Sequence, residues 1–151
     1  MQNTSLFISA QELQARLDLF ENKCRARGLR VTNQRREIFC AVAASREHPS
    51  AETVFLQVRK KLPKVSLDTV YRTLYSLEEM DLLNRVGAAP KERFDGNICP
   101  HAHFVCTKCG AVYDIFPPQY DVPDVPREVR AFGNVCRVSV QFKGICKPCR
   151  K

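Results

Sequence analysis

Hydrophobic residues recur at helical spacing in four stretches of the first half of the chain. Each stretch follows a serine or threonine that can cap a helix, namely Ser9, Thr32, Ser50 and Ser66. The first helix is expected to run for about four turns and to end at Gly28, and the third to continue until Pro63. The fourth, from Ser66 to Leu77, is expected to bury four apolar side chains, Leu67, Val70, Leu74 and Leu77.

Beyond the fourth helix, apolar and polar residues alternate, which is the period of a β-strand. The segments Leu82–Val86 and Glu92–Asp95 predict a short hairpin. Prolines further on predict a rigid loop with a helical turn near residues 128–132. Three more strands are expected, at 104–106, 112–116 and, half-buried, at 137–143.

Helices followed by a hairpin form a winged helix-turn-helix, in which the second helix of the turn, here Ser66 to Leu77, enters the major groove of DNA. We therefore predict an α+β chain with a helical winged-helix domain at 1–88. A hinge at 89–95 and a small α/β domain at 96–151 are expected to follow it.

Composition narrows the class of protein. The chain has 151 residues, 44% of them hydrophobic and 26% charged, which suits one ordinary domain or two small ones. It has no apolar run long enough to span a membrane and no recognisable signal peptide, so we expect a cytoplasmic protein. Eight cysteines in that compartment favour metal binding or redox chemistry over disulfides. A net charge of +8 is compatible with a polyanionic partner.

Basic and polar residues supply candidates for DNA contact. Six basic residues and no acidic one lie between Lys23 and Arg36, forming either a solvated helix face or an arm that contacts phosphates. On the expected recognition helix, Arg72 can donate two hydrogen bonds to a guanine, and Tyr71 can reach thymine methyls or phosphates. Ordinary surface roles for these two remain the alternative. The candidate contacts are Arg30, Arg35, Ser66, Thr69, Tyr71 and Arg72.

Two Cys-x-x-Cys pairs, with 36 residues between them, point to a metal site. Four thiolates suit a closed, tetrahedral, structural zinc site. A redox Cys-x-x-Cys is the alternative, but two pairs in one small domain favour zinc. The expected ligands are Cys106, Cys109, Cys146 and Cys149; Cys24 and Cys40 are expected in the core, and Cys99 and Cys136 receive no role.

A second candidate site contains imidazoles and carboxylates. His101 and His103, two residues apart on an extended segment, project to the same side and can chelate one ion. Asp95 and Asp114 are nearby carboxylates, and His48 is the third imidazole of the chain. Such donors favour Fe(II), Mn(II), Co(II) or Zn(II). An ion bound by all five residues would bridge the two domains; alternatively, His48 caps a helix or lies at the surface.

Five segments together resemble the ferric uptake regulator (Fur) family: residues 30–35, 48–52, 65–74, 101–110 and 144–149. The resemblance implies a homodimeric, metal-dependent bacterial transcription factor that binds operator DNA. It also implies that the C-terminal domain is a dimerisation domain with structural zinc. The chain departs from the usual family pattern at Asn33, where proline is common, and in having no histidine in the strand near 135–143, so a further metal site there is not expected.

Within the family, Arg93-Phe94-Asp95 resembles the peroxide-responsive repressor branch. That branch implies a regulatory site of His48, Asp95, His101, His103 and Asp114, holding Fe(II) or Mn(II). With Fe(II), hydrogen peroxide would oxidise His48 or His101 and release the DNA, whereas the Mn(II) form would not respond. The first alternative is a repressor that senses iron or zinc availability without oxidation. A zinc enzyme using a bound water lacks a nucleophile or base set, so we expect no enzyme and no small-molecule substrate other than peroxide.

Overall fold

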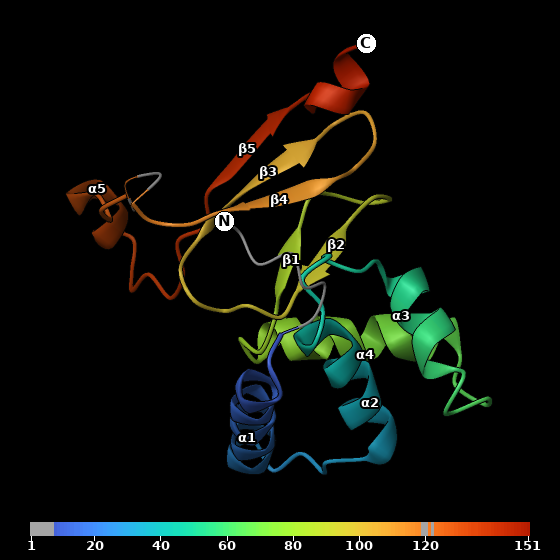
Figure 1. Cartoon of the computed structure of the whole chain (residues 1–151). Helices are drawn as coiled ribbons and strands as arrows, with labels where there is room; N and C mark the ends of the chain where they lie inside the picture. Colours follow the sequence, from blue (N-terminus) through green and yellow to red (C-terminus); the bar gives the residue numbers. More distant parts are fainter. Residues whose placement is uncertain (1–7, 119–120, 122) are drawn as a thin grey trace. The chain divides into compact units, whose positions relative to one another are not determined.

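The computed structural model describes residues 8–118, 121 and 123–151, which form two compact units divided between Ile98 and Cys99 (Figure 1). The first unit contains α1 (Ala10–Ala26), α2 (Asn33–Ala43), α3 (Ala51–Val58), α4 (Leu67–Glu79), β1 (Asn84–Val86) and β2 (Arg93–Asp95). The second contains β3 (Ala102–Cys106), β4 (Val112–Ile115), α5 (Arg127–Arg130), β5 (Gln141–Gly144) and a 3-10 helix (Lys147–Arg150). None of the helices in the described part of the chain is long and apolar enough to cross a membrane.

The division between the units follows the expected hinge closely in sequence. Residues 93–95 of that hinge form β2, which pairs with β1 and belongs to the first unit. The functional assignment to a DNA-binding domain at 1–88, a hinge at 89–95 and a dimerisation domain at 96–151 stays a prediction.

All four predicted N-caps are present. The side chains of Ser9, Thr32, Ser50 and Ser66 each accept a hydrogen bond from the backbone N–H three residues further on. The predicted end of the third helix is wrong, because α3 stops at Val58. The N–H groups of Lys61 and Leu62 both turn back to the Val58 carbonyl, and Pro63 disfavours helical geometry at the residue before it.

One hydrophobic core joins the four helices of the first unit. The rings of Phe20 and Phe39 stack with centroids 4.7 Å apart, which joins α1 to α2. From α4, Val70, Leu74 and Leu77 are fully buried, while Leu67, also expected there, is half-buried. Cys24 lies in this core and Cys40 packs against it, as predicted. Burial raises the pKa of both thiols and makes them unreactive.

The carbonyl groups at and just after the C-terminal end of α4 accept hydrogen bonds from the backbone that follows the helix and from two basic side chains, Lys23 on α1 and Arg27 at its C-cap. The N–H groups of Asp81 and Leu82 return to the carbonyls of Glu78 and Leu77, with Asp81 in the left-handed conformation at φ 55°. Lys23 donates to the carbonyls of Met80 and Asp81, and Arg27 to that of Glu79. Two cations of the basic stretch therefore stabilise the negative end of α4.

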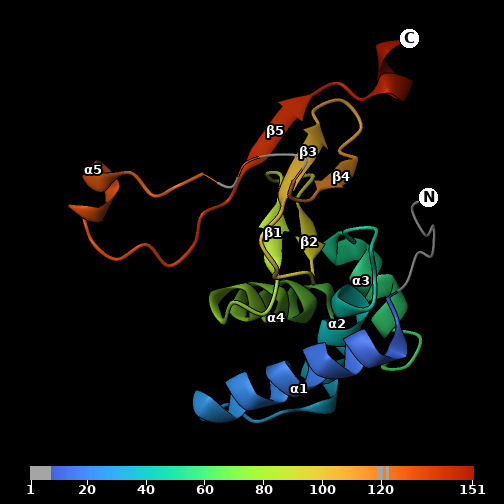
Figure 2. The same ribbon diagram turned by 60° about the vertical axis from the view of Figure 1, so that its left-hand side comes forward.

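Strands β1 and β2 form the predicted hairpin, with Asn84 opposite Asp95 and Arg85 opposite Phe94. In the second unit, β3 lies between β4 and β5, antiparallel to the first and parallel to the second (Figure 2). The half-buried strand expected at 137–143 is wrong in its start, since β5 begins at Gln141, and in its burial, since Val138 and Phe142 are each 47% exposed. The register of β5 with β3 covers only Gln141 to Gly144, opposite His103 to Cys106. Helix α5 lies close to the predicted helical turn.

Candidate metal centres and nucleic-acid interface

The four cysteines of the two Cys-x-x-Cys pairs converge in the second unit. Their sulfur atoms all lie within 4.8 Å of one another, and the Sγ atoms of Cys109 and Cys146 are 3.7 Å apart. A tetrahedral zinc ion with Zn–S bonds of about 2.3 Å separates its sulfurs by about 3.8 Å. The donor set and its spacing therefore fit zinc. Sulfurs drawn from both pairs favour this over a redox site within one pair.

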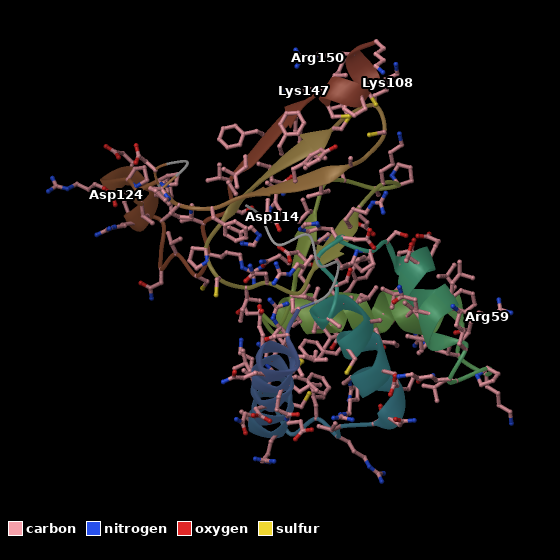
Figure 3. All side chains as sticks on the ribbon, in the orientation of Figure 1. Arg59, Lys108, Asp114, Asp124, Lys147 and Arg150 are labelled. Atoms are coloured by element: carbon pink, nitrogen blue, oxygen red, sulfur yellow. The ribbon has the colours of Figure 1, made fainter. Side chains whose placement is uncertain are left out.

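Backbone geometry creates this cluster. Cys106 ends β3, Cys109 lies in the tight turn toward β4, and Gly110 there has a φ of 75°. The second pair follows β5, whose Gly144 pairs with Cys106. Lys108 donates a 3.3 Å hydrogen bond to the Cys149 carbonyl, which joins the two cysteine turns; its label lies beside those of Lys147 and Arg150 in Figure 3.

Hydrogen bonds to sulfur prepare the cluster for a cation. The N–H groups of Cys146 and Cys109 lie 3.4 and 3.5 Å from the Cys106 Sγ and lower the pKa of that thiol to about 5. Hydrogen bonding to the Cys146 sulfur raises the pKa of Cys149 to about 12. Backbone N–H groups thus stabilise the thiolate form of Cys106, and a bound metal cation would favour the thiolate form of all four cysteines.

Three of the predicted nitrogen and oxygen donors meet in the second unit: His103 on β3, Asp114 on β4, and His101 immediately before β3. The Nε2 atoms of His101 and His103 each lie 3.3 Å from the same Oδ1 atom of Asp114, which is labelled in Figure 3. Asp114 is opposite His103 in the β3–β4 register. The Cys99 carbonyl lies 2.7 Å from Nδ1 of His101, which orients the ring so that Nε2 faces Asp114. Two imidazoles and a carboxylate aimed at one point fit a divalent metal.

The first unit holds the other two predicted donors together. Nε2 of His48 lies 3.8 Å from Oδ2 of Asp95. The other oxygen of Asp95, Oδ1, accepts a 2.8 Å hydrogen bond from the N–H of Asn97. The N–H of Phe94 donates to the Pro49 carbonyl at 3.0 Å, so the residues next to both donors are tied to each other.

His48 itself has an unusual backbone. Its φ is +52°, which lies in the left-handed region. Residues other than glycine adopt this conformation rarely, at a cost of about 1 kcal/mol or more. The capping alternative is wrong, because Ser50 caps α3 and Ala44 ends α2. The surface alternative is also wrong, since the side chain of His48 is buried. Strain at a buried imidazole beside a carboxylate points to a functional site.

The candidate DNA contacts fall into two groups. Ser66, Thr69, Tyr71 and Arg72 lie in or just before the first turns of α4, whereas Arg30 and Arg35 flank the start of α2. The Ser66 hydroxyl accepts from the Thr69 N–H, so its first task is capping. Arg72 is 74% exposed and pairs with Asp68 at 3.0 Å. Arg35 donates to the carbonyl of Arg30.

Tyr71 has a hydrogen-bond partner, Glu52, that the sequence pattern does not predict. The hydroxyl of Tyr71 donates a 2.6 Å hydrogen bond to Glu52 of α3, and this bond raises the pKa of Tyr71 to about 12. Because the hydroxyl is already engaged, a DNA contact of Tyr71, as predicted, would be made chiefly by its ring. Glu52 fixes the orientation of this α4 side chain from 19 residues away.

Comparison with known proteins was made on sequence and on structure. The sequence model of the ferric uptake regulator family matches residues 26–133. The Peroxide-responsive repressor PerR of Staphylococcus epidermidis is 30% identical over 129 residues, which cover 84% of this chain and 85% of that protein.

Solved structures share the fold. The ferric uptake regulator Fur of Helicobacter pylori superposes with a TM-score of 0.71 at 22% identity, covering 92% of this chain and 94% of that one. A zinc uptake regulator complexed with zinc and DNA has a TM-score of 0.61 at 22% identity, covering 91% and 95%.

Proposed function

Because this chain belongs to the ferric uptake regulator family, we propose that it is a cytoplasmic, metal-dependent repressor that binds operator DNA as a homodimer and leaves it when hydrogen peroxide oxidises its regulatory site. The relative named as a peroxide-responsive repressor supports the choice of signal, and the DNA complex of the zinc uptake regulator supports the partner. Membership of a family of regulators argues against the zinc-enzyme alternative.

The observation that carries the proposal is the chemistry of the two donor groups. His48 and Asp95 in the first unit, and His101, His103 and Asp114 in the second, offer nitrogen and oxygen atoms and no thiolate. We propose that all five bind one Fe(II) or Mn(II) ion, which suits these donors. Loss of one imidazole ligand would break the proposed metal-mediated link between the two units and so lower the affinity for DNA.

The four cysteines serve a different purpose in this proposal. Their convergence in a small unit, which has few fully buried apolar side chains, supports a zinc ion that stabilises the fold rather than one that senses. Dimerisation is supported by membership of the family and by the exposed apolar side chains of Phe142 and Val138, because exposed apolar surface is suited to association.

The residues of the regulatory site would act as follows. His101 is held by the Cys99 carbonyl with its Nε2 beside Asp114, and His48 is held in a strained backbone beside Asp95. A bound Fe(II) would mediate the two-electron oxidation of an imidazole by hydrogen peroxide, in which one peroxide oxygen adds to the ring and the other leaves as water; Mn(II) would not. His48 and His101 are the imidazoles proposed to take up an oxygen atom, after which an oxidised ring no longer binds as a ligand.

Anaerobic loading followed by peroxide tests this function. Protein loaded with Fe(II) and, in parallel, with Mn(II) is exposed briefly to hydrogen peroxide, and peptides containing His48 or His101 are weighed by mass spectrometry. We expect one added oxygen atom and lost DNA binding in the Fe(II) sample only. Unmodified histidines together with intact DNA binding would contradict peroxide sensing and leave a repressor that senses iron or zinc availability.

A further inference from the structure

Three side chains connect the recognition helix to the hairpin within the first unit. The hydroxyl of Tyr75, on α4, donates a 2.7 Å hydrogen bond to Oε1 of Glu92, the residue just before β2. Arg85, on β1, lies 3.6 Å from Oε2 of Glu92 and 3.3 Å from the carboxylate of Glu78 on α4. Its guanidinium also lies 5.1 Å from the centre of the Tyr75 ring.

The central carboxylate of this group is costly to leave unpaired. Glu92 is only 8% exposed, and a buried charge that loses its hydrogen-bond partners pays the full cost of leaving water. Both of its oxygens are engaged, one by the helix through Tyr75 and one by the neighbouring strand through Arg85. The hairpin is therefore held to α4 by the hydrogen bond from Tyr75 to Glu92 and by the ion pair of Arg85 with Glu78, as well as by packing.

The same short segment leads to the regulatory donors. Glu92 immediately precedes β2, which contains Phe94 and Asp95, and the ring of Phe94 lies 6.3 Å from that of Tyr75. Phe94 is fully buried and its N–H is bonded to the carbonyl of Pro49, which follows His48. Asp95 is thus connected to Glu92 by one short extended segment, and Glu92 is connected to α4 by its hydrogen bond with Tyr75.

We propose that Tyr75, Glu92 and Arg85 form a latch that couples metal occupancy at His48 and Asp95 to the position of the hairpin relative to α4, and so to DNA affinity. The latch rests on the proposed function and adds a route for regulation inside the DNA-binding unit. Tyr75 and Glu92 are positioning residues, since neither is proposed to touch metal or DNA.

The test compares DNA affinity with and without metal. Duplexes are first selected from a random library with full-length wild-type protein and Mn(II), and their affinity is then measured with and without Mn(II). We expect Tyr75→Phe to reduce the metal-dependent gain in affinity by about tenfold, the worth of one hydrogen bond to a charged group. Mn(II) affinity in the absence of DNA should stay within about twofold of wild type, because His48 and Asp95 are untouched.

Tyr71→Phe is the matched control. It removes the same atom from the same helix, but its glutamate partner, Glu52, lies on α3 and not on the hairpin. We expect this variant to change affinity equally with and without Mn(II), so that the ratio persists. Glu92→Gln, which keeps an oxygen to accept from Tyr75, should retain more of the ratio than Glu92→Ala and guards against misfolding of the alanine variant.

The two levels of the proposal fail in different ways. A wild-type protein that gains no DNA affinity with Mn(II) overturns the proposed function. A wild-type gain that Tyr75→Phe preserves overturns the latch alone. Hydrogen exchange gives a readout without DNA: the latch requires faster exchange of the amides at 93–95 in Tyr75→Phe than in Tyr71→Phe, and equal rates would also overturn it.

Discussion

The N–H of Phe94 donates a hydrogen bond of 3.0 Å to the carbonyl oxygen of Pro49. Because Pro49 follows His48 and Phe94 precedes Asp95, this bond holds two candidate ligands together that lie far apart in the sequence. Asp95 also lies on the same segment as Glu92, which is hydrogen-bonded to Tyr75 of α4. The proposed regulatory ligand and the proposed latch thus share one segment of the first unit.

His48 has a strained backbone and is also a proposed metal ligand. Substitutions can test its effect on stability separately from its effect on metal-dependent DNA binding. Glycine tolerates a φ of +52°, so we expect the metal-free His48→Gly protein to have a free energy of unfolding about 1 kcal/mol higher than that of His48→Ala, which lacks the same buried imidazole. The same variant should lose the Mn(II)-dependent gain in DNA affinity. His48→Ala keeps the strain and should lose the gain without becoming more stable. Urea unfolding and DNA titration give the two readouts, and retained metal dependence in both variants would refute His48 as a ligand.

Gly96 is expected to tolerate no side chain. A Cβ atom there would lie 2.7 Å from the Cα of Ala43 and 3.0 Å from the carbonyl oxygen of Val42, at the end of α2. We expect Gly96→Ala to lower the free energy of unfolding by about 1–3 kcal/mol. Gly28→Ala is the control, since its Cβ meets nothing within 4 Å and only its φ of +66° is unfavourable, at a cost of about 1 kcal/mol. Equal losses measured by urea unfolding would contradict the steric argument.

Zinc removal is expected to unfold the second unit. Without a cation, four sulfurs within 4.8 Å of one another no longer stabilise the turn after β3 and the end of the chain. A strong chelator, or Cys149→Ser, should abolish cooperative thermal unfolding of residues 99–151, at a cost of several kcal/mol. Cys136→Ser, at an exposed thiol outside the cluster, should unfold like wild type. Hydrogen exchange of residues 99–151 measures this unfolding. An unchanged result in Cys149→Ser would rule out a structural metal at the four cysteines.

The hydrogen bond between Tyr71 and Glu52 predicts a specific pH dependence. It lowers the pKa of Glu52, so its stabilisation is complete above the unfolded carboxyl value of about 4.3 and is lost as pH falls through the lower folded value. It raises the pKa of Tyr71 to about 12, so its stabilisation is complete below about pH 10 and is lost as pH rises through about 12.

We therefore expect the difference in unfolding free energy between wild type and Tyr71→Phe to be constant from about pH 5 to pH 9. The difference should become smaller below about pH 5 and above about pH 9. Because Glu52 is exposed, its value between these limits should not exceed about 1 kcal/mol. Urea unfolding across this range measures it. A difference that grows toward acid would contradict the bond.

Association through β5 is expected to depend on Phe142. Phe142 is 47% exposed on β5, so a charge in its place should oppose burial of this surface against a second copy. We expect Phe142→Glu to be monomeric by light scattering at concentrations where wild type is dimeric. Lys143→Glu adds the same residue on the opposite face of β5 and should remain dimeric. A dimeric Phe142→Glu would place the interface elsewhere.

Local features were predicted well because their causes are local. A capping serine accepts a hydrogen bond from an N–H only three residues away. The helix starts at Ser9, Ser50 and Ser66 can therefore be predicted from the sequence alone. The end of α3 and the start of β5 were predicted wrongly, because they depend on where the chain turns back and on how much of β3 is available for pairing. Boundaries of that kind belong to the fold as a whole.

The sequence by itself determined the residue types and spacings of both donor sets, since Cys-x-x-Cys and His-x-His bring their own members to one side of a turn or strand. Tertiary structure decided which of them meet. Parallel pairing of β3 with β5 places Cys146 beside Cys106, and the β3–β4 register places Asp114 beside His103. The contact of Tyr75 with Glu92 likewise has no periodicity to reveal it, because packing, rather than spacing along the chain, brings a helix and a hairpin together.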